Sequence, residues 1–343
     1  MRYGHLPVRQ LHPVTPAPYP RPDRFGRAVK SAVALLAAAL LLSGCATTPQ
    51  WPASANRNHL LSDVPFYPQE KYQCGPAALA TMLSAQGLDT SPEALKPEVY
   101  LPGREGSLQV EMVAAARAHG MLVYPLDGTV DALIEEIDAG HPVLVMQNLR
   151  FDWWPQWHFA VVVGYRENPR ALILNTDTRK HYPMAYEAFM ATWGRADRWA
   201  RVMLPPDQVP ATASPLPFLR AAHDLESTGH LRAAQAAYGT AIETWPQEFA
   251  GWMAAGNLAF ARADLTLAVD RFKQTVTRFP ERAEGWNNLA YTLNRAGWPK
   301  AAEKALTCAQ HLAPERFGQD TLPAATDNGT DYPGTLPACP AAP

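Results

Sequence analysis

The sequence predicts an α+β domain followed by an all-α region of repeated helix pairs, with an export segment in front. Three observations lead to this prediction. Between residues 61 and 204, helical patterns come first and short β-branched runs come after, which favours helices packed on an antiparallel sheet. From residue 215 to residue 314, landmark residues recur every 34 positions. Residues 1–44 join a basic arm to a short apolar stretch.

The export segment ends in a candidate lipidation site. Its apolar run, Ser31–Leu42, is too short to span a bilayer and has the length of a signal-peptide core. The run leads into Leu42-Ser43-Gly44-Cys45, which resembles a bacterial lipobox. This resemblance implies loss of residues 1–44 and a lipid anchor at Cys45, on the periplasmic side of a bacterial membrane. Ala46 favours the outer membrane over the inner, and residues 45–60 are expected to form a tether. An uncleaved anchor is the alternative.

The charge balance argues against a nucleic-acid partner. Residues 1–44 hold six bases and one acid, so the rest of the chain carries 24 bases and 31 acids. A mildly acidic chain lacks the basic footprint of a nucleic-acid-binding protein. The sequence contains no C-x-x-C pair and no phosphate-binding loop of the G-x-x-x-x-G-K-[ST] type, so no metal or cofactor is predicted.

The α+β domain is expected to span residues 61–204. Helices are predicted at 76–86, at 108–119 with Ser107 as the N-cap, and at 131–139. Strands are predicted at 142–149, 158–165, 171–177 and 198–204. These four runs are apolar, rich in β-branched residues and bounded by Gly, Pro, Asn or Asp.

Past a Pro-rich linker at 205–214, the pattern changes to a 34-residue period. The period is carried by Pro246, Pro280 and Pro314, by Trp252 and Trp286, and by Ala234, Ala268 and Ala302. A small residue at the helix crossing and a proline at the end of each unit resemble the tetratricopeptide repeat. Three units are predicted within 215–314, starting near Pro215, Phe249 and Ala283. The resemblance implies a solenoid that binds a protein or peptide partner; an ordinary helical bundle is the alternative. The tail, residues 315–343, is predicted to be disordered.

Cys74 is the one thiol that remains once Cys45 is assigned to lipidation and the two C-terminal cysteines to a disulfide. In an oxidising compartment Cys308 and Cys339 are candidates for a disulfide that fastens the tail. Pro76 suits the first turn of a helix, which places Cys74 at the helix N-terminus. Unpaired N–H groups and the helix dipole stabilise a thiolate there, so a lowered pKa is predicted. The alternative is a small apolar residue that fills the core.

A predicted hairpin brings a base and a carboxylate together. With a four-residue turn after Tyr165, that residue pairs with Arg170, and His158 then faces Asp177. A cysteine nucleophile needs such a base and a group that orients it. Asn175 lies on the same face and is the second candidate for orienting the imidazole.

These motifs together carry a family resemblance. Pro68-Gln69, Cys74-Gly75-Pro76-Ala77-Ala78-Leu79, the run from His158 to Tyr165, and an aspartate after an apolar strand resemble the bacteriocin-processing, double-glycine-leader cysteine peptidases. The resemblance covers roughly residues 60–205. It implies a papain-like fold in which Cys74 is the nucleophile, His158 the base and Asp177 the orienting acid.

The same resemblance implies that a glutamine upstream of the cysteine holds the oxyanion. Gln69 is preferred for this role, although it lies one residue nearer to the nucleophile than is usual in the family, and Gln73 is the alternative. Thr178 also stands where the family usually has a proline. Trp154 and Trp157 are expected to form a wall or lid of the substrate cleft, with core packing as the alternative.

The sequence therefore predicts a lipid-anchored peptidase that hydrolyses a peptide or protein substrate through a Cys-His-Asp triad. The helical repeats would recruit a protein partner. Two other functions fit the same residues. One is a non-catalytic scaffold that binds peptides, and the other is an acyltransferase that passes the thioester to an amine.

Overall fold

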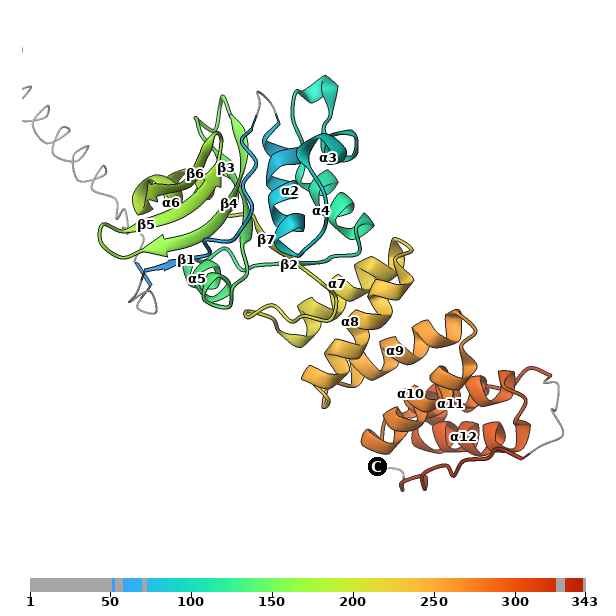
Figure 1. Ribbon diagram of the computed structural model, residues 1–343. Helices are drawn as coiled ribbons and strands as arrows, with labels where there is room; N and C mark the ends of the chain where they lie inside the picture. Colours follow the sequence, from blue (N-terminus) through green and yellow to red (C-terminus); the bar gives the residue numbers. More distant parts are fainter. Residues whose placement is uncertain (1–50, 53–57, 70–72, 325–330, 342–343) are drawn as a thin grey trace, which may run out of the picture. The chain divides into compact units, whose positions relative to one another are not determined.

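The computed structural model describes residues 51–52, 58–69, 73–324 and 331–341 (Figure 1). The predicted signal segment and the predicted lipidation site Cys45 lie outside these residues. Among the helices of the described residues, none combines the length and the apolar character that a membrane crossing requires.

An antiparallel sheet of seven strands forms the centre of the N-terminal region in the described residues, in the order β2-β7-β3-β4-β5-β6, with β1 paired to β4. The strands are β1 (His59–Leu60), β2 (Leu122–Pro125), β3 (Val143–Asn148), β4 (Trp157–Arg166), β5 (Ala171–Thr176), β6 (Arg179–Ala185) and β7 (Ala200–Leu204). The four predicted strands correspond to β3, β4, β5 and β7 and are confirmed. The patterns of β2 and β6 were not distinctive enough to predict them.

Helices cover both faces of the sheet. One face packs against α2 (Cys74–Ala85), α3 (Pro92–Val99) and α4 (Gln109–Ala118), with a 3-10 turn, η1 (Pro102–Arg104), between the last two. The other face packs against α5 (Val130–Asp138) and α6 (Tyr186–Gly194). Along β4 the side chains alternate between the two cores: Phe159 and Val161 face α2, whereas Ala160 and Val162 face the opposite layer. An α+β architecture with an antiparallel sheet is therefore confirmed for this region.

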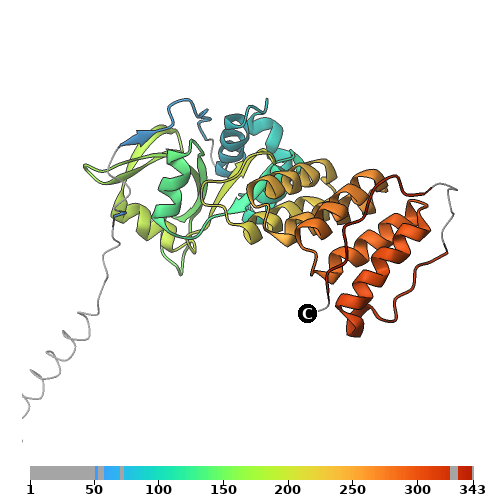
Figure 2. The same ribbon diagram turned by 90° about the horizontal axis from the view of Figure 1, so that it is seen from below.

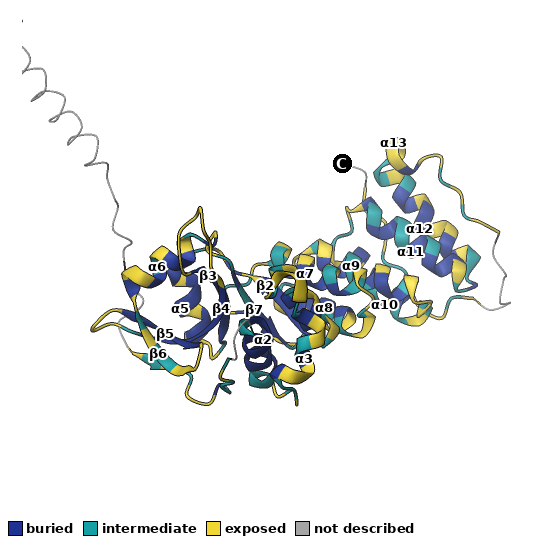
Figure 3. Ribbon diagram, turned by 90° about the horizontal axis from the view of Figure 1, so that it is seen from above, coloured by how far each residue is buried: buried dark blue, intermediate teal, exposed yellow. Residues whose placement is uncertain are grey.

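Helix α2 is buried along most of its length. Every residue from Gly75 to Leu83 is buried, which Figure 3 shows as a dark blue helix beside the sheet. A helix that is apolar all round belongs inside a core. It also begins at Cys74 itself, two residues before the predicted start, so the cysteine occupies the first position of a rigid element.

Ser107 does not cap α4, contrary to the prediction. The N-cap of α4 is Leu108, and its side chain makes no capping hydrogen bond. The Ser107 hydroxyl instead lies against Gly75, where a Cβ on Gly75 would come within 2.1 Å of Ser107 Oγ. Gly75 is thus required by the close approach of the Ser107 side chain.

A bulge in β4 changes the predicted hairpin register. Tyr165 pairs with Leu172, two residues beyond the predicted partner Arg170, and the register then shifts by one residue between Val162 and Gly164. Gly164 lies under β1, where a Cβ would come within 2.4 Å of the His59 carbonyl oxygen. The predicted pairing of His158 with Asp177 is therefore wrong. The turn lies one residue later than predicted, since Arg166 pairs with Ala171, and the bulge offsets only one of the two residues by which the register differs.

The C-terminal region is helical and keeps the 34-residue period. Its helices are α7 (Pro215–Ser227), α8 (Leu231–Thr244), α9 (Phe249–Ala261), α10 (Leu265–Arg278), α11 (Ala283–Arg295), α12 (Pro299–Leu312) and the short α13 (Pro314–Phe317). Each odd-numbered helix from α7 to α11 begins 34 residues after the one before it, and neighbouring helices lie side by side (Figure 1, Figure 2). Equivalent indole groups make equivalent bonds: Trp252 donates to the Pro246 carbonyl oxygen at 3.0 Å, and Trp286 donates to that of Pro280 at 2.7 Å.

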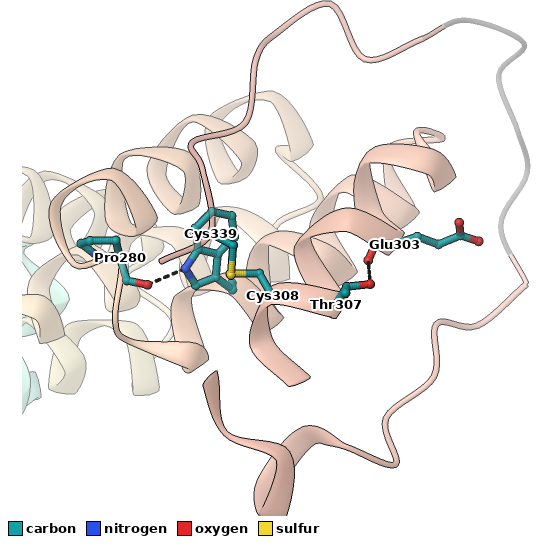
Figure 4. Close-up of a disulfide and its surroundings, with 6 residues drawn as sticks. Pro280, Glu303, Thr307, Cys308 and Cys339 are labelled. Atoms are coloured by element: carbon teal, nitrogen blue, oxygen red, sulfur yellow. Dashed lines mark hydrogen bonds between the residues drawn. A yellow bond between two sulfur atoms is a disulfide. The ribbon is translucent and has the colours of Figure 1, made fainter. Parts of the chain in front are cut away.

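The described residues of the tail are held against the last helix pair, in contrast to the predicted disorder of 315–343. A disulfide joins Cys308 of α12 to Cys339 (Figure 4). The Tyr332 ring packs on Trp298 with 5.2 Å between the centroids, and Leu336 is packed on the same core. The composition of the tail predicts that few of its residues are buried. The disulfide, however, closes a loop that brings these apolar side chains back to the helices.

The segment 205–214, predicted as a linker, is fastened at its end by a buried carboxylate. Glu136 of α5 is fully buried and accepts hydrogen bonds from the Thr212 N–H (2.8 Å), the Thr212 hydroxyl (2.7 Å) and the Ala211 N–H (3.2 Å). His141 Nδ1 lies 2.7 Å from the same carboxylate. Burial acts to raise the pKa of Glu136, but the hydrogen bonds from His141 and Thr212 outweigh it and the pKa is lowered.

Candidate active site

Cys74 opens helix α2 with its sulfur beside strand β4. Gln73 is the N-cap of the helix, and Cys74 is half-buried. The main-chain N–H groups of Phe159, Gly75 and Cys74 itself lie close enough to the sulfur to favour its thiolate. Phe159 directly follows His158, so the helix N-terminus and the start of β4 meet at this point. The first two members of the predicted triad are thereby brought to the same place.

Burial reverses the predicted direction of the Cys74 pKa. Desolvation at the junction of α2 and the sheet raises the pKa of the thiol, and the negative charge of Asp177 adds to the rise. The N–H groups of Phe159 and Gly75 lower it, but by less. Desolvation disfavours the charged form of a thiol, and here it outweighs the stabilisation of the thiolate at the helix N-terminus. The resting thiol is therefore protonated over a wider pH range than an exposed cysteine.

His158 is buried at the start of β4, with 7% of its surface exposed. Its Nε2 lies 2.7 Å from the Thr176 hydroxyl at the end of β5. Burial lowers the pKa of the imidazole, Asp177 raises it in part, and Arg179 lowers it further. Thr176 thus bonds the imidazole, the role that the sequence predicted for Asp177. In the described residues no hydrogen bond joins the imidazole to the Cys74 sulfur, and Nδ1 is the ring nitrogen that remains for it.

Asp177 stands one residue beyond Thr176, in the tight turn between β5 and β6. Its φ of 53° is in the left-handed region, which Asp tolerates in hairpin turns. The carboxylate is 56% exposed and pairs with Arg179 at 3.3 Å. Its charge nevertheless acts on both Cys74 and His158. Asp177 thus lies near Cys74 and His158 and acts on them through its negative charge.

The glutamines and Asn175 fall into distinct environments. The Gln69 N–H donates to the Asp177 carbonyl oxygen at 2.9 Å, which joins the segment before α2 to the end of β5. Gln73 abuts the cysteine as the N-cap residue. The Asn175 amide is engaged elsewhere, donating to the Pro65 carbonyl oxygen at 3.3 Å and accepting from the His181 N–H at 3.1 Å. Asn175 therefore holds the surrounding segments together, whereas the choice between Gln69 and Gln73 as oxyanion donor stays a prediction.

An exposed aromatic loop leads into His158. The side chains of Trp153, Trp154 and Trp157 are 78%, 60% and 51% exposed, so the core-packing alternative for these residues is wrong. Phe151 stacks on Trp153 with 5.5 Å between the ring centroids. A cavity of about 610 Å³ lies along this loop between Leu149 and Arg195. The predicted contact of Trp154 and Trp157 with substrate stays a prediction.

Thr176 is the residue that sequence reasoning missed. The sequence signal available was Gly164, an isolated glycine inside a strand pattern, which is typical of a bulge or of close backbone approach and so indicates an irregular register. The bulge shifts the pairing of β4 with β5 by one residue, and the pairs end at Val161 and Asn175, before His158 is reached. In the described residues, no three His, Cys, Asp or Glu side chains form a group that would hold a metal ion.

Comparison with known proteins gives a family match and related solved structures. Residues 61–200 match the model described as the Peptidase_C39 like family. A crystal structure named as a "putative C39-like peptidase from Bacillus anthracis" is 17% identical, with a TM-score of 0.37, and the match covers 43% of this chain and 98% of that one. No curated protein matches the chain. Residues 61–200 therefore form a domain similar to the C39-like peptidases, followed by a helical C-terminal region.

Proposed function

We propose that this protein is a cysteine peptidase that uses Cys74 as its nucleophile and His158 as its base. The observation that carries the proposal is the meeting of the α2 N-terminus with the start of β4, which sets the sulfur beside the residue after His158. The match of residues 61–200 to a peptidase family supports it. The substrate would be a peptide or a protein.

In the proposed reaction, the imidazole takes the thiol proton at Nδ1 while Nε2 stays bonded to Thr176. The sulfur attacks the peptide carbonyl carbon, and the Cys74 N–H with an upstream glutamine amide, preferably that of Gln69, stabilises the oxyanion. The imidazolium then protonates the leaving amine, and water hydrolyses the thioester. Asp177 stabilises the imidazolium through its charge.

The C-terminal helices would recruit a protein partner. A cavity of about 460 Å³ opens between α9 and α11 and is lined by apolar side chains such as Met253 and Phe249 and by the amides of Asn257 and Asn288. Such a surface suits an extended peptide or a helix. We further propose that a lipid on Cys45 tethers the chain to the periplasmic side of a bacterial membrane.

The test is hydrolysis of a denatured protein by the full chain and by its Cys74→Ala variant. The wild type is expected to release peptides and the variant to release none, with equal unfolding temperatures, because the substitution removes a reacting atom. Alkylation by iodoacetamide, followed at Cys74 by peptide mass spectrometry, should accelerate as pH rises above the ordinary pKa of a thiol, about 8.5. The raised pKa of Cys74 gives this direction.

Three outcomes would overturn the proposal. Undiminished hydrolysis by Cys74→Ala would assign the activity elsewhere. Binding of an intact peptide, with neither hydrolysis nor alkylation at Cys74, would leave a peptide-binding scaffold. A product whose mass shows a new amide in place of a free acid would indicate an acyltransferase.

A further inference from the structure

A cavity of about 540 Å³ lies where α4 and β7 meet helix α7, and its lining residues are separate from the candidate active site. A second cavity of about 490 Å³ adjoins it. The two share Val113 and Arg117 of α4 and Arg201 of β7. The paired cavities therefore form one recess with two arginines in the middle.

The two arginines carry more positive charge than the structure neutralises. Arg117 donates from Nη2 to Asp224, but its Nε is buried and has no hydrogen-bond partner in the described residues. Arg201 donates to the Ala200 carbonyl oxygen at 2.7 Å and lies over the Trp199 ring at 4.8 Å. Asp224 is half-exposed, with 49% of its side chain accessible. The partly solvated Asp224 pairs with Arg117, whereas no carboxylate of the described residues forms an ion pair with Arg201.

Burial makes this arrangement costly without an anion. Desolvation, followed by the charge of Arg117, lowers the pKa of Arg201. A partly buried cation beside a like charge lacks both hydration and a counter-ion. The neighbouring Arg117 Nε–H is shielded from solvent and has no hydrogen-bond partner in the described residues, so the Arg117 guanidinium is not fully satisfied. The electrostatics of the recess therefore favour a bound anion.

The geometry points to a carboxylate group of a peptide, which we propose is bound by the guanidinium groups of Arg201 and Arg117. Guanidinium groups match the planar shape of a carboxylate. The rest of the first cavity is partly apolar, with Val123, Leu126 and Pro217 in its wall. The choice of a peptide rests on the proposed function, whereas the recognition of a carboxylate rests on the arginines.

The length of the recess suits an extended chain better than a small anion. The second cavity runs along α4 from Gln109 to Arg117. Eight residues of helix rise by roughly 12 Å, which is the length of three to four residues of extended peptide. Thr228 and His230, from the turn between α7 and α8, form its other side. The site thus requires both the α+β region and the first helix pair.

The test measures binding of fluorescein-labelled peptides to the full chain carrying Cys74→Ala, so that hydrolysis plays no part. Three peptides of equal length are compared: one with a central Glu and an amidated C-terminus, one with Gln and a free C-terminus, and one with Gln and an amidated C-terminus. Binding of the peptide with Glu identifies the carboxylate as that of a side chain. Binding of the peptide with a free C-terminus identifies it as that of a chain end. The neutral third peptide should bind at least about tenfold more weakly.

Arg201→Gln should weaken the carboxylate peptide by about tenfold or more, and Arg201→Lys should restore part of the loss. Arg201→Gln should leave the unfolding temperature unchanged or higher, because it removes a like charge from beside Arg117. Arg232→Gln, an exposed change on α8 with the same charge effect, should bind as the parent does. Equal binding of all three peptides, or equal loss in Arg232→Gln, would overturn the proposal. Absence of hydrolysis in the wild type would leave this binding result untouched.

Discussion

At the scale of single residues, the chemistry depends on what surrounds one sulfur and one imidazole. Burial keeps the Cys74 thiol and the His158 imidazole neutral, since it raises the pKa of the first and lowers that of the second. The bond of Thr176 to Nε2 fixes the imidazole so that Nδ1 is free for the thiol proton. Asp177 modulates both groups from the adjacent turn.

Thr176→Val should lower kcat/KM by about 10- to 100-fold, because it removes the hydrogen-bond partner of a buried imidazole and leaves the strand volume nearly unchanged. Loss of that partner also destabilises the imidazolium, so the acidic limb of the pH–rate profile should move to lower pH. Thr176→Ser keeps the hydroxyl and should restore most of the activity.

The Asp177→Asn variant is compared with Thr176→Val. It removes a charge that raises both pKa values, so both limbs of the pH–rate profile should shift to lower pH. Full activity in Thr176→Val together with loss in Asp177→Asn would return the orienting role to Asp177.

At the scale of elements, the position of Cys74, the proposed nucleophile, depends on the contact between α2 and the segment before α4. The Ser107 hydroxyl is buried, lacks a hydrogen-bond partner in the described residues and lies against Gly75. This contact leaves no room for a side chain at position 75. Because Gly75 has no Cβ, the first turn of α2, which carries Cys74, packs directly against Ser107.

Gly75→Ala should destabilise the fold by about 1–3 kcal/mol and reduce hydrolysis, because its Cβ would come within 2.5 Å of the Ser107 Cβ. The double variant Gly75→Ala/Ser107→Gly should recover most of both losses. Urea unfolding and peptide release measure the two effects. Gly87→Ala is not an equivalent control, because Gly87 has a φ of 81°; Gly103, whose surroundings are open, provides one. Failure of the double variant to recover would show that the contact with Ser107 is not the cause.

At the scale of the whole molecule, the described part of the chain is joined across the predicted linker by polar groups as well as by apolar packing. Glu136 holds Thr212 and Ala211, while Tyr124 accepts from the Ser214 N–H at 3.2 Å. Phe218 and Leu225 of α7 belong to the same core as the sheet. The recess around Arg117 and Arg201 exists because this junction is closed.

Glu136→Gln should lower the free energy of unfolding by about 1–3 kcal/mol at neutral pH, because a buried, hydrogen-bonded carboxylate becomes a neutral amide. The folded-state pKa of Glu136 is lowered, so its contribution is present above the unfolded value of about 4.3 and is lost as pH falls through the folded pKa. The wild type should therefore lose more stability on acidification than the variant. Glu135→Gln, at the exposed neighbouring position, is the matched control. Equal stability of both variants would contradict the role of Glu136.

The sequence by itself determined the local elements and their order. Periodicity and turn residues located the strands around His158, the helix that begins at Cys74 and the 34-residue spacing of the C-terminal helices, because these features depend on neighbours within a few turns of chain. The tertiary structure decided which distant groups meet. The observed strand register and turns placed Thr176 rather than Asp177 at the imidazole, burial reversed the shift of the thiol pKa, and a disulfide drew the tail onto the helices. Each of these outcomes depends on desolvation or on strand register, which are set only when remote segments pack together.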